Sequence, residues 1–141
     1  MHTDRKYVSG PALRTALEER LKRIAREEAV DLQRLRRQVA FDRFLARHFR
    51  SPQSDWVLKG GYAMELRFQA ARATRDLDFT LRATPAGMDD AILDYLQDAG
   101  AMDAGDLISF RVSEATIDLE GAPYGGARYP VEAKMAGRTF V

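Results

Sequence analysis

Cysteine is absent from the 141-residue chain, and only two histidines, His2 and His48, are present. The missing thiols exclude disulfides, thiolate metal sites and catalysis by a cysteine nucleophile. Because the two histidines lie far apart in the sequence, we do not expect a histidine-rich metal site. Any metal should be a hard cation bound by oxygen ligands.

Long apolar runs are also missing. No stretch approaches the ~20 apolar residues that a helix needs to cross a bilayer, and no signal-peptide pattern opens the chain. The sequence therefore predicts a cytoplasmic protein that does not associate with a membrane. Its length is enough for one modest domain with a core of its own.

Charge is unevenly distributed, although the net charge is only +1. Residues 1–50 contain 13 Lys and Arg against 7 Asp and Glu, whereas residues 51–141 contain 9 against 14. One interpretation is a basic region for nucleic acid next to an acidic metal site. The other is a pair of helices with arginine-rich solvated surfaces, and charge alone favours this second interpretation.

Two helices are predicted in residues 1–50. Ser9-Gly10-Pro11 is typical of a helix start, and apolar residues at helical spacing follow as far as Ala29. Asp31 should cap a second helix over about 32–49, with apolar residues on its buried side. Arginines are predicted to occupy much of its remaining surface. They are Arg34, Arg36, Arg37, Arg43 and Arg47.

From Trp56 onward the pattern is that of alternating short strands and helices. The order predicts an α/β (α+β) fold, in which two N-terminal helices precede a mixed sheet with flanking helices. Met64 and Phe68 are predicted to be buried. Strands are expected at 56–58, 76–81, 107–112, 115–119 and 129–135, and helices at 62–68 and 88–99.

Lys59-Gly60-Gly61 lies between a predicted strand and a predicted helix. Glycines let the backbone approach a ligand closely, and the helix that follows directs its free N–H groups and positive dipole end at the same spot. Such a turn suits a triphosphate. Alone, it is more often a simple turn.

Asp76 and Asp78 are two residues apart on a predicted strand, so their side chains should project from the same face. Two adjacent carboxylates repel each other, and a divalent cation such as Mg²⁺ relieves that repulsion. Taken alone, Asp-x-Asp is common, and two solvated aspartates on an exposed strand face are the favoured interpretation.

The two features together change the interpretation. A glycine turn followed about fifteen residues later by Asp-x-Asp is the arrangement of the polymerase-β-like nucleotidyltransferase superfamily. More closely, Lys-Gly-Gly-x-Ala followed by Arg-x-Thr-x-Asp-hydrophobic-Asp resembles the AbiEii/AbiGii-type toxins of type IV toxin–antitoxin and abortive-infection systems. The matching positions are Lys59, Gly60, Gly61, Ala63, Arg72, Thr74, Asp76 and Asp78.

The resemblance implies a Mg²⁺-dependent enzyme that transfers a nucleotide from a nucleoside triphosphate (NTP) to an acceptor such as tRNA, with a cognate antitoxin as a partner. It makes residues 1–50 a basic helical region and residues 51–141 the nucleotidyltransferase core. Asp76 and Asp78 would be catalytic and hold the metal. Gly60 and Gly61 would bind the triphosphate, and Thr74 would position the loop around it. Lys59, Arg72 and Arg75 would offset phosphate charge, with a role as surface or scaffold cations the equal alternative.

One element of the family pattern is not found. The superfamily uses a third carboxylate, and the AbiEii pattern has it soon after the Gly-Arg-Thr segment, whereas this sequence stops at Val141. Asp118, with Glu120 two residues on, is a weak substitute. We therefore expect a C-terminally truncated chain with an incomplete core. The alternative function is a non-catalytic relative that binds nucleotide, RNA or antitoxin.

Overall fold

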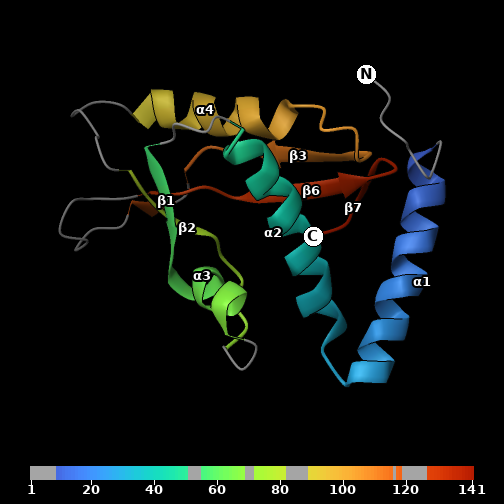
Figure 1. Cartoon of the computed structure of the whole chain (residues 1–141). Coiled ribbons are helices and arrows are strands. Elements are labelled where there is room, and N and C mark those ends of the chain that lie inside the picture. The colour runs from blue at the N-terminus through green and yellow to red at the C-terminus, as the bar shows by residue number, and fades with distance from the viewer. Residues whose placement is uncertain (1–8, 51–54, 69–71, 82–88, 116, 119–126) are drawn as a thin grey trace.

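The computed structural model describes residues 9–50, 55–68, 72–81, 89–115, 117–118 and 127–141. Two helices lead into short helices and small antiparallel sheets, β1-β2, β3-β6-β7 and β4-β5, which confirms the predicted α/β class (Figure 1). In chain order the elements are α1 (Gly10–Glu28), α2 (Leu32–His48), β1 (Trp56–Lys59), α3 (Gly60–Arg67), β2 (Asp78–Leu81), α4 (Asp89–Ala101), β3 (Ile108–Val112), β4 (Ile117–Asp118), β5 (Ala127–Arg128), β6 (Val131–Met135) and β7 (Arg138–Thr139).

The two N-terminal helices begin where the sequence predicts. The Ser9 hydroxyl accepts a hydrogen bond from the Ala12 backbone N–H at 3.3 Å, and the Asp31 carboxylate accepts one from Arg34 at 3.1 Å. Both are N-caps that satisfy helix donors lacking an intrahelical partner. Ala29 adopts a left-handed conformation and ends α1. The helix boundaries predicted in this region are therefore confirmed.

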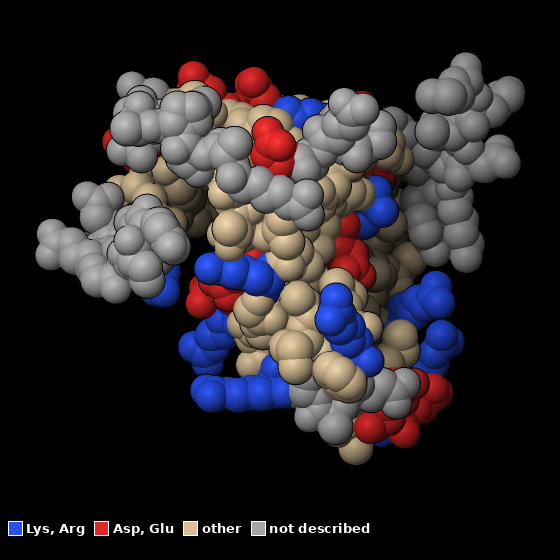
Figure 2. Space-filling view, turned by 60° about the vertical axis from the view of Figure 1, so that its left-hand side comes forward, with Lys and Arg blue, Asp and Glu red and all other residues tan. Residues whose placement is uncertain are grey.

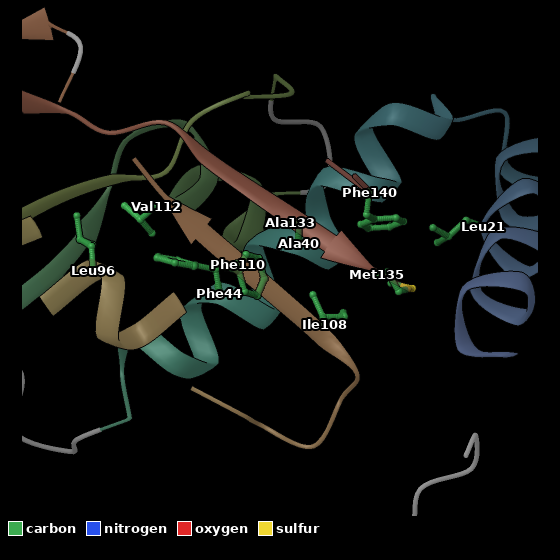
Figure 3. Packing of buried hydrophobic residues seen from close by; sticks show 10 residues of the cluster. All are labelled: Leu21, Ala40, Phe44, Leu96, Ile108, Phe110, Val112, Ala133, Met135 and Phe140. Carbon is green, nitrogen blue, oxygen red and sulfur yellow. The ribbon is translucent and has the colours of Figure 1, made fainter. Parts of the chain in front are cut away.

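The core lies where α2 and α4 pack on the β3–β6 ladder (Figures 1 and 3). β3 alternates buried and exposed residues, and β6 pairs with it in antiparallel register, with Phe110 opposite Ala133. Phe44 of α2 meets Phe110 edge to face at 5.3 Å between ring centroids. Residues of α1 and α2 thus share one hydrophobic cluster with the strands.

A group of aromatic rings attaches the β1–β2 pair to this core. His48 at the end of α2 stacks on Phe79 of β2, with ring centroids 4.3 Å apart, and meets Trp56 of β1 at 4.5 Å. Trp56 in turn stacks on Tyr95 of α4. The β1–β2 ladder is therefore fixed at one end, and α3 lies at its other end, away from α4 (Figure 1).

Some sequence predictions about burial were wrong. Met64 and Phe68 are 50% and 56% exposed, whereas Tyr62 is 2% exposed, because α3 turns Tyr62 toward Phe41 of α2. Arg47 was placed on the polar surface of α2, yet its side chain is fully buried. Helical periodicity gives the relative faces of a short helix but does not say which face meets the rest of the protein.

Candidate functional site

The pairing of β1 with β2 brings the glycine turn to the acidic strand. The two strands are antiparallel, and Lys59, the last residue of β1, lies opposite Asp78, the first residue of β2. Gly60 and Gly61 follow Lys59 directly and open α3. Segments that are distant in the sequence therefore meet at one end of this ladder.

Glycine is required at position 60 by the backbone conformation there and by the close approach of Asp78. Its φ is +74°, in the left-handed region that favours glycine. A Cβ at this position would lie 3.1 Å from the Asp78 Cβ and closer still to its Oδ2 atom. The turn therefore places bare backbone directly against the carboxylate.

Gly61 approaches the loop before β2 in a similar way. A Cβ here would lie 2.8 Å from the Cβ of Thr74 and 3.0 Å from its hydroxyl oxygen. The Thr74 hydroxyl also lies 3.4 Å from both the backbone nitrogen and the backbone oxygen of Asp76. Thr74 thus connects the glycine turn to the backbone of the first aspartate.

Asp76 and Asp78 are both exposed, but only Asp78 belongs to the strand. β2 begins at Asp78, so the predicted strand over 76–81 starts two residues too early. The alternation of exposed and half-buried residues nevertheless runs from Asp76 to Leu81. β1 ends at Lys59, opposite Asp78, so Asp76 lies beyond the end of the β1–β2 ladder.

Glu65 is a structural residue of the site that the sequence analysis missed. Its side chain is only 4% exposed, and its Oε1 accepts a hydrogen bond from the Thr74 backbone N–H at 2.6 Å. Its Oε2 accepts one from Gln38 at 3.3 Å and lies 3.4 Å from an Arg34 nitrogen. One carboxylate thus joins α2, α3 and the loop that leads to Asp76. A Glu on an eight-residue helix gave no sequence signal for this role.

Tyr62 makes a second connection between α3 and α2. Its hydroxyl donates a short hydrogen bond to a carboxylate oxygen of Asp42, and its ring meets Phe41 edge to face. Burial, followed by the hydrogen bond and charge of Asp42, raises the pKa of the Tyr62 phenol well above its ordinary value. Tyr62 therefore stays protonated near neutral pH and serves as an anchor.

An open pocket of about 700 Å³ lies in front of these residues. Three of the predicted phosphate-binding residues, Gly61, Arg72 and Arg75, line it together with Asp76. Lys59 and Asp78 are exposed and, like Gly60, are not among the residues that line the pocket, although Gly60 directly precedes Gly61, which does. Figure 2 shows that, on the face in view, most of the Lys and Arg side chains lie in the lower half of the molecule. The full lining is Arg37, Gly61, Arg72, Ala73, Thr74, Arg75 and Asp76.

Arg37 is the unexpected member of this lining, because the sequence analysis treated it as one of several surface arginines. It comes from α2, and its Nε atom is buried without a hydrogen-bond partner among the described residues. No local pattern separates it from Arg34 or Arg36. Only the packing of α2 on α3 brings it to the pocket.

The weak candidates for a third carboxylate lie elsewhere. Asp118 is on β4, which pairs with β5 and, within the described residues, with neither β1 nor β2. Glu120 lies outside the described residues. Among the side chains that the structure describes, no group of three acidic or histidine residues is arranged to hold a metal ion.

The family assignment rests on a sequence match that contains the whole site except Arg37 and its neighbours on α2. Residues 43–140 match the model of the nucleotidyl transferase AbiEii toxin of type IV toxin–antitoxin systems. The chain belongs to the AbiEii toxin family. No curated protein is similar enough to the chain to count as a relative. The family makes the chain a nucleotidyltransferase-type toxin and implies a cognate antitoxin as its partner.

None of the helices described in this AbiEii family member is long and apolar enough to span a membrane.

Proposed function

We propose that this AbiEii toxin transfers a nucleotide from an NTP to an RNA acceptor such as tRNA, with Mg²⁺ as cofactor. The supporting observation is the close approach of Gly60 to Asp78, which brings the glycine turn against one of the two proposed metal-binding carboxylates. Two carboxylates beside bare backbone offer the oxygen ligands and open space that Mg²⁺ and a triphosphate need. The residues present therefore fit this cofactor.

Each residue of the site has a distinct role in the proposal. Asp76 and Asp78 would hold Mg²⁺, which neutralises phosphate charge when bound. The free backbone N–H groups at the start of α3, including that of Gly61, would bind phosphate oxygens. Arg72 and Arg75 would offset negative charge at the pocket, and Lys59 would do so at the β1–β2 end. Nucleotide transfer depends mainly on such positioning and charge neutralisation.

The position of Asp76 is set indirectly. The Thr74 hydroxyl accepts a hydrogen bond from the Asp76 backbone N–H, and the Glu65 carboxylate accepts one from the Thr74 backbone N–H. This arrangement would keep one metal ligand at a fixed place without a strand hydrogen bond. It would also leave the Asp76 side chain exposed to the pocket, where a metal with its own waters could bind.

The test is transfer of label from each of the four α-labelled NTPs to tRNA and to total RNA, with and without Mg²⁺. We expect incorporation by the wild-type chain and a loss of about 10²–10⁴-fold in Asp76→Asn and Asp78→Asn, as is typical when one catalytic group is removed. Asp94→Asn is the matched control, because Asp94 is an exposed aspartate of α4 that does not line the pocket.

The outcomes separate the two functions considered. Incorporation that survives both site substitutions would overturn the proposed site. Mg²⁺-dependent NTP binding that both substitutions abolish, without any transfer, would support the non-catalytic binding module instead. RNA binding without NTP binding would contradict the proposed substrate.

A further inference from the structure

Arg37 of α2 has a hydrogen-bond donor without an acceptor among the described residues, as a residue that binds a ligand would. It lines the same pocket as Gly61 and Asp76, and its Nε–H is buried without an acceptor among the described residues. A buried donor with no acceptor is costly, because it has lost its water without gaining another hydrogen bond. Native structures contain few such groups. One explanation for such a group is that a bound ligand supplies the acceptor.

Other arginines of α2 contrast with Arg37. Arg36 pairs with Glu18 at 2.6 Å, and Arg34 lies 3.4 Å from Glu65. Further along the helix, Arg43 and Arg47 both pair with Asp106. These four arginines therefore have structural partners within the protein, whereas Arg37 lines the pocket and its buried Nε has no partner among the described residues.

The position of Arg37 is fixed by contacts of the residues that follow it along α2. Gln38 donates to Glu65, and one turn later Phe41 and Asp42 hold Tyr62. These contacts hold α2 on α3, whose first turn contains the glycines. Arg37 is therefore held beside α3, the helix that begins at the glycine turn.

The geometry points to Arg37 as a binding residue for a phosphate group of the NTP. This inference rests on the proposed function and adds a residue from outside the segment that matches the family, residues 43–140. The planar guanidinium forms two parallel hydrogen bonds with a phosphate, which a backbone turn or a lysine does not offer in the same form. A triphosphate is favoured over RNA backbone because Gly61 and Asp76, the proposed triphosphate and metal residues, line the same pocket.

The test compares the full chain with Arg37→Gln, Arg37→Lys and Arg20→Gln. Arg20 is an exposed arginine of α1 outside the pocket, so its variant matches the change in charge. Calorimetry with Mg²⁺ would measure the binding of an NTP, the matching nucleoside monophosphate and inorganic tripolyphosphate, and fluorescence anisotropy would measure tRNA binding. Thermal unfolding without ligand would report whether each variant folds.

We expect Arg37→Gln to weaken the binding of NTP and tripolyphosphate by roughly 10- to 100-fold, the usual size of a charge-assisted hydrogen bond. Monophosphate and tRNA binding should change much less. Arg37→Lys should recover part of the affinity, since it restores charge but not the planar fork. Arg20→Gln should bind as the wild type does, and the unfolding temperature of Arg37→Gln should not fall, because Nε has no partner to lose.

Several results would overturn the inference. One is unchanged triphosphate affinity in Arg37→Gln when Asp76→Asn and Asp78→Asn abolish binding, which leaves the proposed function intact. Another is an effect confined to tRNA, which would make Arg37 an RNA contact. If the wild-type chain binds neither NTP nor tripolyphosphate, the proposed function and this inference both fail. An unfolding temperature that falls in both Arg37 variants, without a selective effect on triphosphate, would show a structural role.

Discussion

Arg47 and Asp106 form a two-point ion pair between the end of α2 and the residues before β3. Arg47 Nη2 lies 2.6 Å from Asp106 Oδ1, and Nη1 lies 2.9 Å from Oδ2. The buried guanidinium also donates to the carbonyls of Met102 and Ile108. Burial alone would raise the pKa of Asp106, but the hydrogen bonds from Arg47 and Arg43 outweigh it and lower that pKa to about 2.

Substitution Asp106→Ala should therefore destabilise the protein strongly. It leaves a fully buried guanidinium without its carboxylate, a change that typically costs about 3–5 kcal/mol. Denaturant unfolding at pH 7 would measure the loss. Glu132→Ala is the control, because its pair with Lys134 is 3.4 Å long and about two-fifths exposed, and such pairs contribute less than about 1 kcal/mol. Equal losses in the two variants would contradict this account.

His48 should make the protein less stable in mild acid. Its ring is fully buried among aromatic side chains, and neither ring nitrogen has a hydrogen-bond partner in the part of the chain that the structure describes. Burial and, to a smaller extent, the charge of Arg50 lower its pKa from 6.5 to about 4. The unfolded chain therefore binds a proton at a higher pH than the folded chain does. Stability should fall as the pH drops from about 6.5 to about 4, by roughly 3 kcal/mol in total.

A pH series of unfolding experiments on the wild type and His48→Phe would isolate this effect. The variant keeps an aromatic ring in the cluster but cannot take up a proton, so its stability should depend less on pH in that window. Below about pH 4, loss of the Asp106 carboxylate should destabilise both proteins alike, because the lowered pKa of that group favours folding only while it is ionised. Identical curves between pH 7 and 4.5 would rule out His48 as the cause.

Gly60→Ala should damage the site beyond its backbone strain. Gly137 provides a matched control, since both glycines have φ above +70° and a Cβ at Gly137 would meet nothing within 4 Å. Each alanine should cost about 1 kcal/mol for the left-handed conformation. Only Gly60→Ala should also displace Asp78, so we expect at least a tenfold loss of Mg²⁺-dependent NTP binding in that variant alone. Equal NTP affinity in Gly60→Ala and Gly137→Ala would show that the glycine turn is not part of the NTP site.

Glu65→Gln should loosen the loop that holds Asp76. The substitution keeps one acceptor for the Thr74 N–H but removes the charge opposite Arg34 and presents an amide to Gln38. We expect a loss of roughly 1–3 kcal/mol in stability, the cost of a buried polar group left without a partner. NTP affinity should fall with it, whereas Glu27→Gln on the exposed surface of α1 should change neither. Unchanged affinity would mean that Glu65 stabilises the fold alone.

Local sequence patterns fixed much of the secondary structure. Ser9 and Asp31 cap helices because their side chains reach backbone donors a few residues away, an interaction that needs no distant segment. The apolar alternation of Ile108 to Val112 likewise produced a strand with one buried face. The motif residues around Gly60 and Asp78 were sufficient to predict the family, and the match over residues 43–140 confirmed it.

Tertiary packing decided everything that depends on distant segments. Arg37, Arg36 and Arg47 are indistinguishable as helix residues, yet one lines the pocket, one pairs across the helical hairpin and one is buried against Asp106. Glu65 likewise acquires its three partners only when α2 and the loop before β2 both pack on α3. Helical periodicity states which side chains share a face, but what that face meets depends on loop paths and on the fit of whole elements, which no short stretch of sequence encodes.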